Sequence, residues 1–301
     1  MNMTEDQFCS LFSIGAGEPL IGTTGETHYF FLLEYNGVWN DKALDKSEIP
    51  EAVKSHLKNL TKELPYSKIL LIKQVHHSKE QDIRFFVVVV KEQGSRLYRF
   101  QLSSYLELLD LDLIALSRCD PFFDPFLQKD PLYLVCTNGR RDQCCAKFGT
   151  KVYEKLNERV GDLAWKCSHV GGHRFAANFF VMPYGLLYGR MRPEKVDELL
   201  KYTIRGEIDL DSLRGRSLYP PVVQAAEYYL HCHTGDLGLA AFRLSEAEES
   251  KPGLWQVSFV HSMSNQEYSL KLTVNKSSQL VFESCAFDKQ TPITRYSLIT
   301  S

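Results

Sequence analysis

The sequence predicts an α/β protein with two successive α/β units and a small α+β appendage. Apolar runs of strand length alternate with stretches in which apolar residues recur at helical spacing. This alternation is interrupted near Pro121 and Pro125 and then restarts, and strand-like segments dominate the last part of the chain. The 301 residues are enough for two or three compact units. We expect these units over residues 1–130, 131–206 and 207–301.

The first unit is predicted to follow a β-α-β-β-β order. Residues 27–35 form an apolar run that reads as a buried strand, and Asn36-Gly37 ends it. Ser47 fits the N-cap of a helix over residues 49–64, which Pro65 stops. The three strands that follow are expected over residues 68–73, 83–91 and 97–102.

Residues 106–130 are predicted to be a linker that packs on the surface, because acidic and apolar segments alternate there with prolines. The second unit follows a β-α-β-β-β-α order, and Pro193 opens its last helix at a first-turn position. Its elements are expected over residues 132–136, 143–160, 164–168, 178–182, 186–190 and 193–206. In the tail we expect one helix over residues 221–233 and then strands around Gln256, Ser269, Val281 and Ser297.

Composition narrows the class of protein. A formal net charge of −2 gives no electrostatic reason to expect nucleic acid or an anionic membrane as a partner. The longest apolar run, residues 85–90, falls far short of the ~18 residues that cross a bilayer. The acidic N-terminus lacks the features of a secretion signal, so we expect a cytoplasmic protein. Four of the eight cysteines lie between 136 and 167, which favours metal or redox chemistry over disulfides.

Two cysteines and two histidines in the second unit make a four-ligand metal set. Cys136 and Cys145 have eight residues between them, and His169 and His173 have three. Glycines lie beside or between these residues, where a Cβ would crowd the metal or its bridging sulfides. Two sulfur and two nitrogen ligands suit a structural zinc ion. They equally suit a [2Fe–2S] cluster with cysteines on one iron and histidines on the other.

Two further cysteines are alternative ligands. Cys144 directly precedes Cys145, and only one of the two need bind the metal. Cys167 lies two residues before His169, so strand alternation would turn it to the same side and allow a Cys3His zinc set. The His169–His173 spacing also occurs on zinc-binding helices, but Gly171-Gly172 predicts a tight loop here.

Charged residues border the predicted ligands, and they have two interpretations. Arg140, Arg141, Asp142 and Arg174 either form a solvated loop, with an ion pair worth well under ~1 kcal/mol, or tune the metal and dock an acidic redox partner. The remaining histidines have no thiol partners in sequence, and we expect surface positions for His76, His77, His231 and His233.

The ligand segments resemble those of a known family. C-T-N-G-R-R-D-Q-C-C-A and W-K-C-S-H-V-G-G-H-R-F-A-A-N are similar to motifs of the sucrase/ferredoxin-like family, as are flanking segments over most of residues 20–235. The Pro-Tyr-Gly turn, Tyr-Gly and Pro-Glu-x-Val-Asp helix that follow have the order of parts of a thioredoxin-like ferredoxin. The resemblance implies that residues 131–206 form such a domain. It also implies a [2Fe–2S] cluster in which H-x-x-x-H replaces the second cysteine pair, and its spacing favours Cys145 over Cys144.

Together these observations predict an electron carrier rather than an enzyme with its own substrate. The expected cofactor is a [2Fe–2S] cluster on Cys136, Cys145, His169 and His173, and the expected partner is an unidentified redox protein. Because a ligating imidazole keeps a ring proton, we expect reduction of the cluster to be coupled to proton uptake. The alternative is a structural zinc protein that acts as an interaction module. Nothing in the sequence proposes the carboxylate pair of a glycosidase.

Overall fold

The computed structural model describes residues 8–75, 82–286 and 288–299. His76 and His77, for which surface positions were expected, lie outside these residues. The strands are β1 Tyr29–Glu34, β2 Ser67–Lys73, β3 Ile83–Val89, β4 Arg96–Leu102, β5 Leu132–Cys136, β6 Ala164–Cys167, β7 Phe179–Met182, β8 Leu186–Tyr188, β9 Leu213–Arg216, β10 Phe242–Lys251, β11 Leu254–His261, β12 Glu267–Phe282 and β13 Gln290–Leu298. The α-helices are α1 Cys9–Gly15, α2 Glu51–Glu63, α3 Leu113–Ser117, α4 Gln143–Val160, α5 Val196–Arg205 and α6 Pro221–Thr234.

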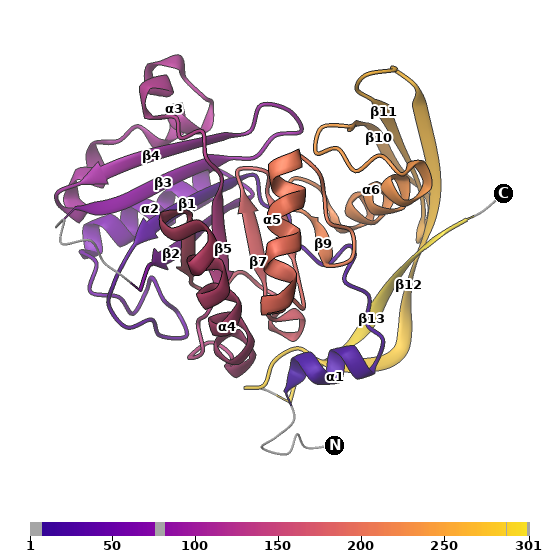
Figure 1. The fold of residues 1–301 in the computed structure, drawn as a ribbon, viewed down its shortest axis with the longest axis horizontal. Coiled ribbons are helices and arrows are strands. Elements are labelled where there is room, and N and C mark those ends of the chain that lie inside the picture. Colours follow the sequence, from indigo (N-terminus) through magenta and orange to yellow (C-terminus); the bar gives the residue numbers. More distant parts are fainter. Residues whose placement is uncertain (1–7, 76–81, 287, 300–301) are drawn as a thin grey trace.

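The strands form two sheets, so the mixed α/β class predicted from the sequence is confirmed (Figure 1). A nine-stranded mixed sheet has the order β4-β3-β1-β2-β6-β5-β7-β8-β9. A four-stranded antiparallel sheet has the order β10-β11-β12-β13. None of the described helices has the length and apolar character needed to cross a membrane.

The large sheet runs through the first two predicted units without a break. β2 pairs antiparallel with β6, and β9 adds to the far edge beside β8. Side chains from both units share one apolar cluster on one face of this sheet. The rings of Phe30 and Phe180 lie 5.3 Å apart, and those of Phe86 and Trp165 lie 5.5 Å apart. The boundaries at residues 130 and 206 stay predictions, but the two units are joined by hydrogen bonds and by packing.

Helices pack against the large sheet, whose strands point successive side chains to opposite faces. On β5, Leu134 and Cys136 face the shared cluster, whereas Tyr133 and Val135 face the opposite layer. That opposite layer contains the apolar stripe of α4 and the inner face of α5, which lie side by side in front of β5 and β7 (Figure 1). α4 begins and ends at the residues that the sequence predicts.

Several local predictions need correction. α2 begins at Glu51 after Pro50, and the Ser47 hydroxyl donates to the Leu44 carbonyl instead of capping the helix. The predicted linker contains short helices over Tyr105–Asp110, Leu113–Ser117 and Pro121–Phe126, and it buries apolar side chains in the core. In the tail, β9 and β10 were not predicted, and Val281 belongs to the long strand β12.

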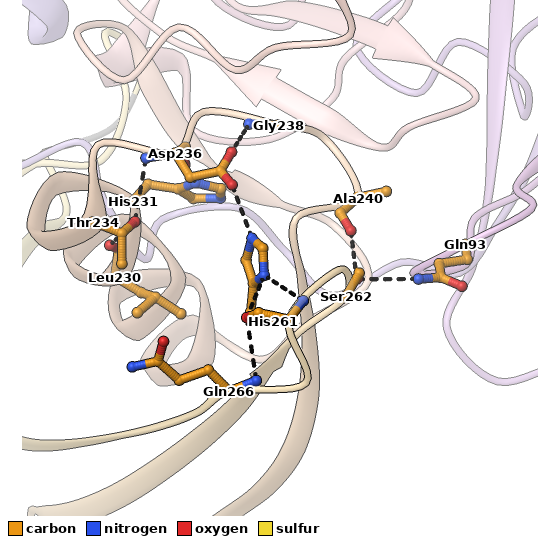
Figure 2. A network of polar contacts seen from close by, with 11 residues as sticks. Gln93, Leu230, His231, Thr234, Asp236, Gly238, Ala240, His261, Ser262 and Gln266 are labelled. Atoms are coloured by element: carbon orange, nitrogen blue, oxygen red, sulfur yellow. Dashed lines mark hydrogen bonds and ion pairs between the residues drawn. The ribbon is translucent and has the colours of Figure 1, made fainter.

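A polar network fastens the second sheet to the end of α6 (Figure 2). The His261 ring nitrogen Nε2 lies 3.0 Å from Asp236 Oδ2, and the Gly238 amide donates to Asp236 Oδ1 over 2.9 Å. Gln93, between β3 and β4, donates to the Ser262 hydroxyl over 3.3 Å. The surface position predicted for His231 is wrong, because its ring is buried and hydrogen-bonded to the Asp236 carbonyl. His233 is exposed as predicted.

Candidate metal centre

The predicted ligands gather at one edge of the large sheet. β5 and β6 run parallel, with Cys136 opposite Cys167, so their carboxyl ends meet at the same edge. β5 ends at Cys136, and the loop after β6 carries His169. Cys145 lies in the first turn of α4, which starts beside that edge. Strand ends and a helix N-terminus therefore bring together residues that are up to 33 positions apart.

Three of the four predicted ligands converge. The sulfur atoms of Cys136 and Cys145 and one ring nitrogen of His169 all lie within 4.8 Å of one another. Both cysteines are fully buried, whereas His169 is half-buried. This arrangement gives a site with its sulfur side inside the protein and its imidazole side at the surface.

His173 lies against His169 rather than inside the converging group. The two rings are stacked, with centroids 4.3 Å apart and planes inclined by 26°. The Nδ1 atoms of both rings are buried and have no hydrogen-bond partner among the described residues. A buried polar atom without a partner costs free energy, so two such atoms on the stacked rings at this site fit nitrogen atoms that bind a metal or cluster.

The protonation states of Cys136 and His173 suit metal ligation, whereas Cys145 keeps its proton, because its hydrogen bond to Cys136 and its burial raise the pKa of Cys145 well above the usual range. The Cys145 thiol donates toward Cys136, and this contact, helped by His169, holds the pKa of Cys136 well below its usual range despite burial. Burial and the neighbouring His169 lower the pKa of His173 to about 4. A thiolate and a neutral imidazole are the forms that bind metals.

Glycines let α4 and the loop after β6 that carries His169 and His173 (the ligand loop) approach the site closely. Gly172 has φ +67°, and a Cβ there would lie 2.5 Å from the Arg214 guanidinium. A Cβ on Gly149 in α4 would lie 2.2 Å from the carbonyl oxygen of Cys136. Larger side chains at these two positions would push the loop or the helix away from the site.

Two cationic residues to which the sequence assigned no role support the loop after β6. Arg214, on β9, is buried and donates to Asn178 Oδ1 over 2.7 Å and to the Gly171 carbonyl over 3.2 Å. Lys68 donates to the Val170 carbonyl over 2.8 Å, and burial and nearby Arg214 lower its pKa. The R-G-R segment was visible in the sequence, but its distance along the chain from the ligands hid its role.

The residues expected to border the site have different roles. Arg140 is exposed and Arg141 is half-buried, whereas Arg174 is paired with Glu18 over 2.8 Å. Asp142 is 2% exposed and caps α4 by accepting from the Cys144 amide over 2.9 Å. The expectation that Asp142 lies in a solvated loop beside the site is therefore wrong, because its carboxylate is buried and caps α4.

The two alternative cysteines point elsewhere. Cys167 is buried beside Cys136, but its sulfur is not among the three converging ligand atoms. Cys144 faces a second group, with its sulfur 3.5 Å from that of Cys9 and 3.3 Å from that of Cys285. Hydrogen bonds from Cys285 and Cys9 lower the pKa of Cys144 to about 4.

Comparisons with known proteins find relatives among fungal proteins named altered inheritance of mitochondria protein 32. The protein of Meyerozyma guilliermondii is 31% identical over 97 residues, which are 29% of this chain and 34% of that protein. The protein of Candida glabrata is 23% identical over 159 residues, which are 46% of this chain and 51% of that protein. The chain thus matches between a third and a half of the length of these relatives.

No solved structure matches the chain. The family comparison covers the whole of the candidate centre and most of the large sheet. The sequence model of the sucrase/ferredoxin-like family matches residues 20–215, and the chain therefore belongs to the sucrase/ferredoxin-like family.

Proposed function

We propose that this protein is a one-electron carrier whose [2Fe–2S] cluster is held by Cys136, Cys145, His169 and His173. The observation that supports this most strongly is the convergence of two buried sulfur atoms and one imidazole nitrogen within 4.8 Å. A second imidazole is stacked on the first, and its buried Nδ1, which has no hydrogen-bond partner in the described part of the chain, would supply the fourth ligand. Such a cluster, when bound, accepts and returns a single electron without making a bond to a substrate.

The protein's own residues set the conditions for this transfer. Cys136 and Cys145 are shielded from water, whereas half-buried His169 reaches the surface. Arg214 and Lys68 place positive charge behind the ligand loop. Positive charge near anionic sulfur favours the reduced state, so it raises the reduction potential.

The imidazoles would also couple the electron to a proton. If Nδ1 of each histidine ligates, Nε2 holds the remaining ring proton. That proton leaves more easily when the bound iron is ferric than when it is ferrous. The reduction potential should therefore fall with rising pH, by about 59 mV per pH unit where one proton accompanies one electron.

Exposed Arg140 and half-buried Arg141 lie in the loop between Cys136 and α4. A positive loop beside the site would attract an acidic redox partner and orient it toward the ligands. We infer a carrier that serves another protein rather than an enzyme that holds its own small substrate.

Zinc binding is the second candidate function, because zinc accepts two cysteines and two histidines readily. A structural zinc ion usually stabilises a small module that cannot build a core. Here the candidate ligands lie at one edge of a nine-stranded sheet that has an extensive apolar core. A fold with such a core has little need of a structural metal.

The two candidates separate in one experiment. The full chain is expressed with ample iron, purified without oxygen and analysed for iron, acid-labile sulfide and zinc. The electron-carrier proposal expects a red-brown protein with about two iron and two sulfide per chain. A colourless protein with zinc bound by two sulfur and two nitrogen atoms would contradict it and support the zinc function.

A further inference from the structure

A second group of metal-binding side chains lies on the other side of the first turn of α4. It consists of Cys9, Asp142, Cys144 and Cys285, and each contributes one ligand atom within 4.8 Å of the others. Cys9 and Cys144 are fully buried, Asp142 is nearly so, and Cys285 is half-buried. None of these residues belongs to the proposed cluster site, although Cys144 is the immediate neighbour of Cys145.

The spacing of these atoms is close to that of a tetrahedral zinc site. With Zn–S bonds of about 2.3 Å, the sulfur atoms of such a site lie about 3.8 Å apart. Here the Cys144 sulfur lies 3.5 Å from that of Cys9 and 3.3 Å from that of Cys285. The Cys9 sulfur lies 3.9 Å from Asp142 Oδ1. The remaining pairs of ligand atoms lie within 4.8 Å of one another, so shifts of at most about 1 Å would complete the tetrahedron.

The surroundings supply the hydrogen bonds that orient metal ligands. The Ser10 hydroxyl donates to the Cys144 sulfur over 3.3 Å, and the Cys9 amide donates to the Cys285 sulfur over 3.3 Å. Asp142 accepts from the Cys144 amide, the Ser284 hydroxyl and the Cys285 amide. A carboxylate has about four acceptor positions, so one remains for a metal.

A disulfide explains this group less well than a metal does. A disulfide would use two of the three sulfur atoms and would leave the third thiol and the buried carboxylate beside it without a role. A single divalent ion uses all four groups and neutralises part of their negative charge. Thiolate-rich sets select soft cations, and zinc is the common divalent ion that needs no redox chemistry.

We propose that Cys9, Asp142, Cys144 and Cys285 form a zinc site separate from the proposed cluster. The ligands come from α1, from the start of α4 and from the connection between β12 and β13. Figure 1 shows α1 beside the end of that hairpin, and the rings of Phe12 and Phe282 meet there at 5.1 Å. Bound zinc would tie both segments to the first turn of α4. This inference does not depend on the proposed electron transfer.

The test uses the full chain, expressed with zinc and iron and purified anaerobically with a thiol reductant. Zinc-edge X-ray absorption reads the zinc ligands without interference from iron. We expect about one zinc per chain, with three sulfur neighbours at about 2.3 Å and one oxygen at about 2.0–2.2 Å. A chain without zinc, or with zinc bound only by two sulfur and two nitrogen atoms, overturns the proposal. The iron and sulfide content of the same preparation tests the electron-carrier proposal independently.

Variants locate the zinc in the same preparation. Cys9→Ser and Cys285→Ser should each lower the zinc content at least tenfold and leave the iron content unchanged, and Cys285→Asp should restore zinc. Cys232→Ser, at an exposed cysteine of α6, is the matched control and should retain both metals. Zinc that persists in both Cys9→Ser and Cys285→Ser overturns the proposal. If either variant fails to fold, the zinc-edge X-ray absorption spectrum of the natural chain still decides whether the zinc has three sulfur ligands and one oxygen ligand.

Discussion

Two adjacent cysteines at the start of α4 have different surroundings. Successive residues of an α-helix point about 100° apart, so Cys144 and Cys145 cannot face the same ligand set. The sequence identifies the cysteine pair and, through family spacing, favours Cys145 as the ligand. It cannot reveal what Cys144 faces, because Cys9 and Cys285 are 135 and 141 residues away from it.

This difference leads to a direct prediction. Cys145→Ser should lose the red-brown colour and most of the iron, because Cys145 supplies one of the two converging sulfur atoms. Cys144→Ser should keep the iron, because its sulfur faces the other group. Iron analysis of both variants is the measurement. The opposite pattern, with iron lost only from Cys144→Ser, would place the ligand one residue earlier.

The burial of His173 predicts a pH dependence of stability for the metal-free protein. Its pKa is about 4 in the folded state, below its ordinary value of 6.5, so only the unfolded state takes up a proton between these values. Stability is therefore complete above pH ~6.5 and falls by up to about 3 kcal/mol as the pH drops toward 4. Urea unfolding of the metal-free chain across this range measures the loss.

Carboxylates titrate in the same range, so a matched variant is needed. His173→Asn removes the titrating ring and keeps a polar side chain of similar size, and it should lose less stability than the natural chain over the same interval. Equal losses in the two proteins would mean that His173 takes up its proton in the folded state.

At the level of elements, the helices and strands with strong periodicity were predicted well. α4 has the predicted bounds, because its apolar stripe is long and Gly161 ends it. β9 was missed because Leu213–Arg216 contains two arginines and a glycine, a composition that argues against a buried strand. Its burial depends on a partner that local sequence does not show, since Arg216 pairs with Glu227 of α6.

The Arg216–Glu227 pair should matter for stability. Its N–O distance is 2.9 Å, and both side chains are almost fully buried. Arg216→Ala would leave the Glu227 carboxylate buried without its partner, at a cost of ~3–5 kcal/mol. The control is Arg159→Ala, which breaks an exposed pair with Asp197 and should cost less than ~1 kcal/mol. Thermal unfolding of both variants provides the comparison, and equal shifts would contradict this reasoning.

At the scale of the whole molecule, strand order was the part that the sequence could not predict. The β2–β6 pairing joins Ile72 to Cys167 across 95 positions, and no local pattern encodes such a neighbour. The apolar runs showed that the strands would be buried, but not that the first two units would share one sheet. The candidate ligands could be predicted from short motifs, whereas the contacts of Arg214 and Lys68 with the loop after β6 join residues far apart in the sequence and could not.

The shared sheet predicts that residues 131–206 do not fold alone. Without the first unit, Leu134, Trp165 and Phe180 would lose the apolar partners that bury them. The fragment should show no cooperative unfolding transition and should bind hydrophobic dyes, in contrast to the full chain. A cooperative transition in the isolated fragment would mean that residues 131–206 are an independent domain.

The central claim is that two histidines and two cysteines bind one [2Fe–2S] cluster. Pulsed electron paramagnetic resonance of the reduced full chain, with nitrogen-15 introduced only in histidine, tests it most directly. The account predicts couplings between the electron spin and two directly bound histidine nitrogen atoms, one of which disappears in His173→Cys. A paramagnetic cluster without histidine couplings, or a zinc protein without a signal, would contradict it.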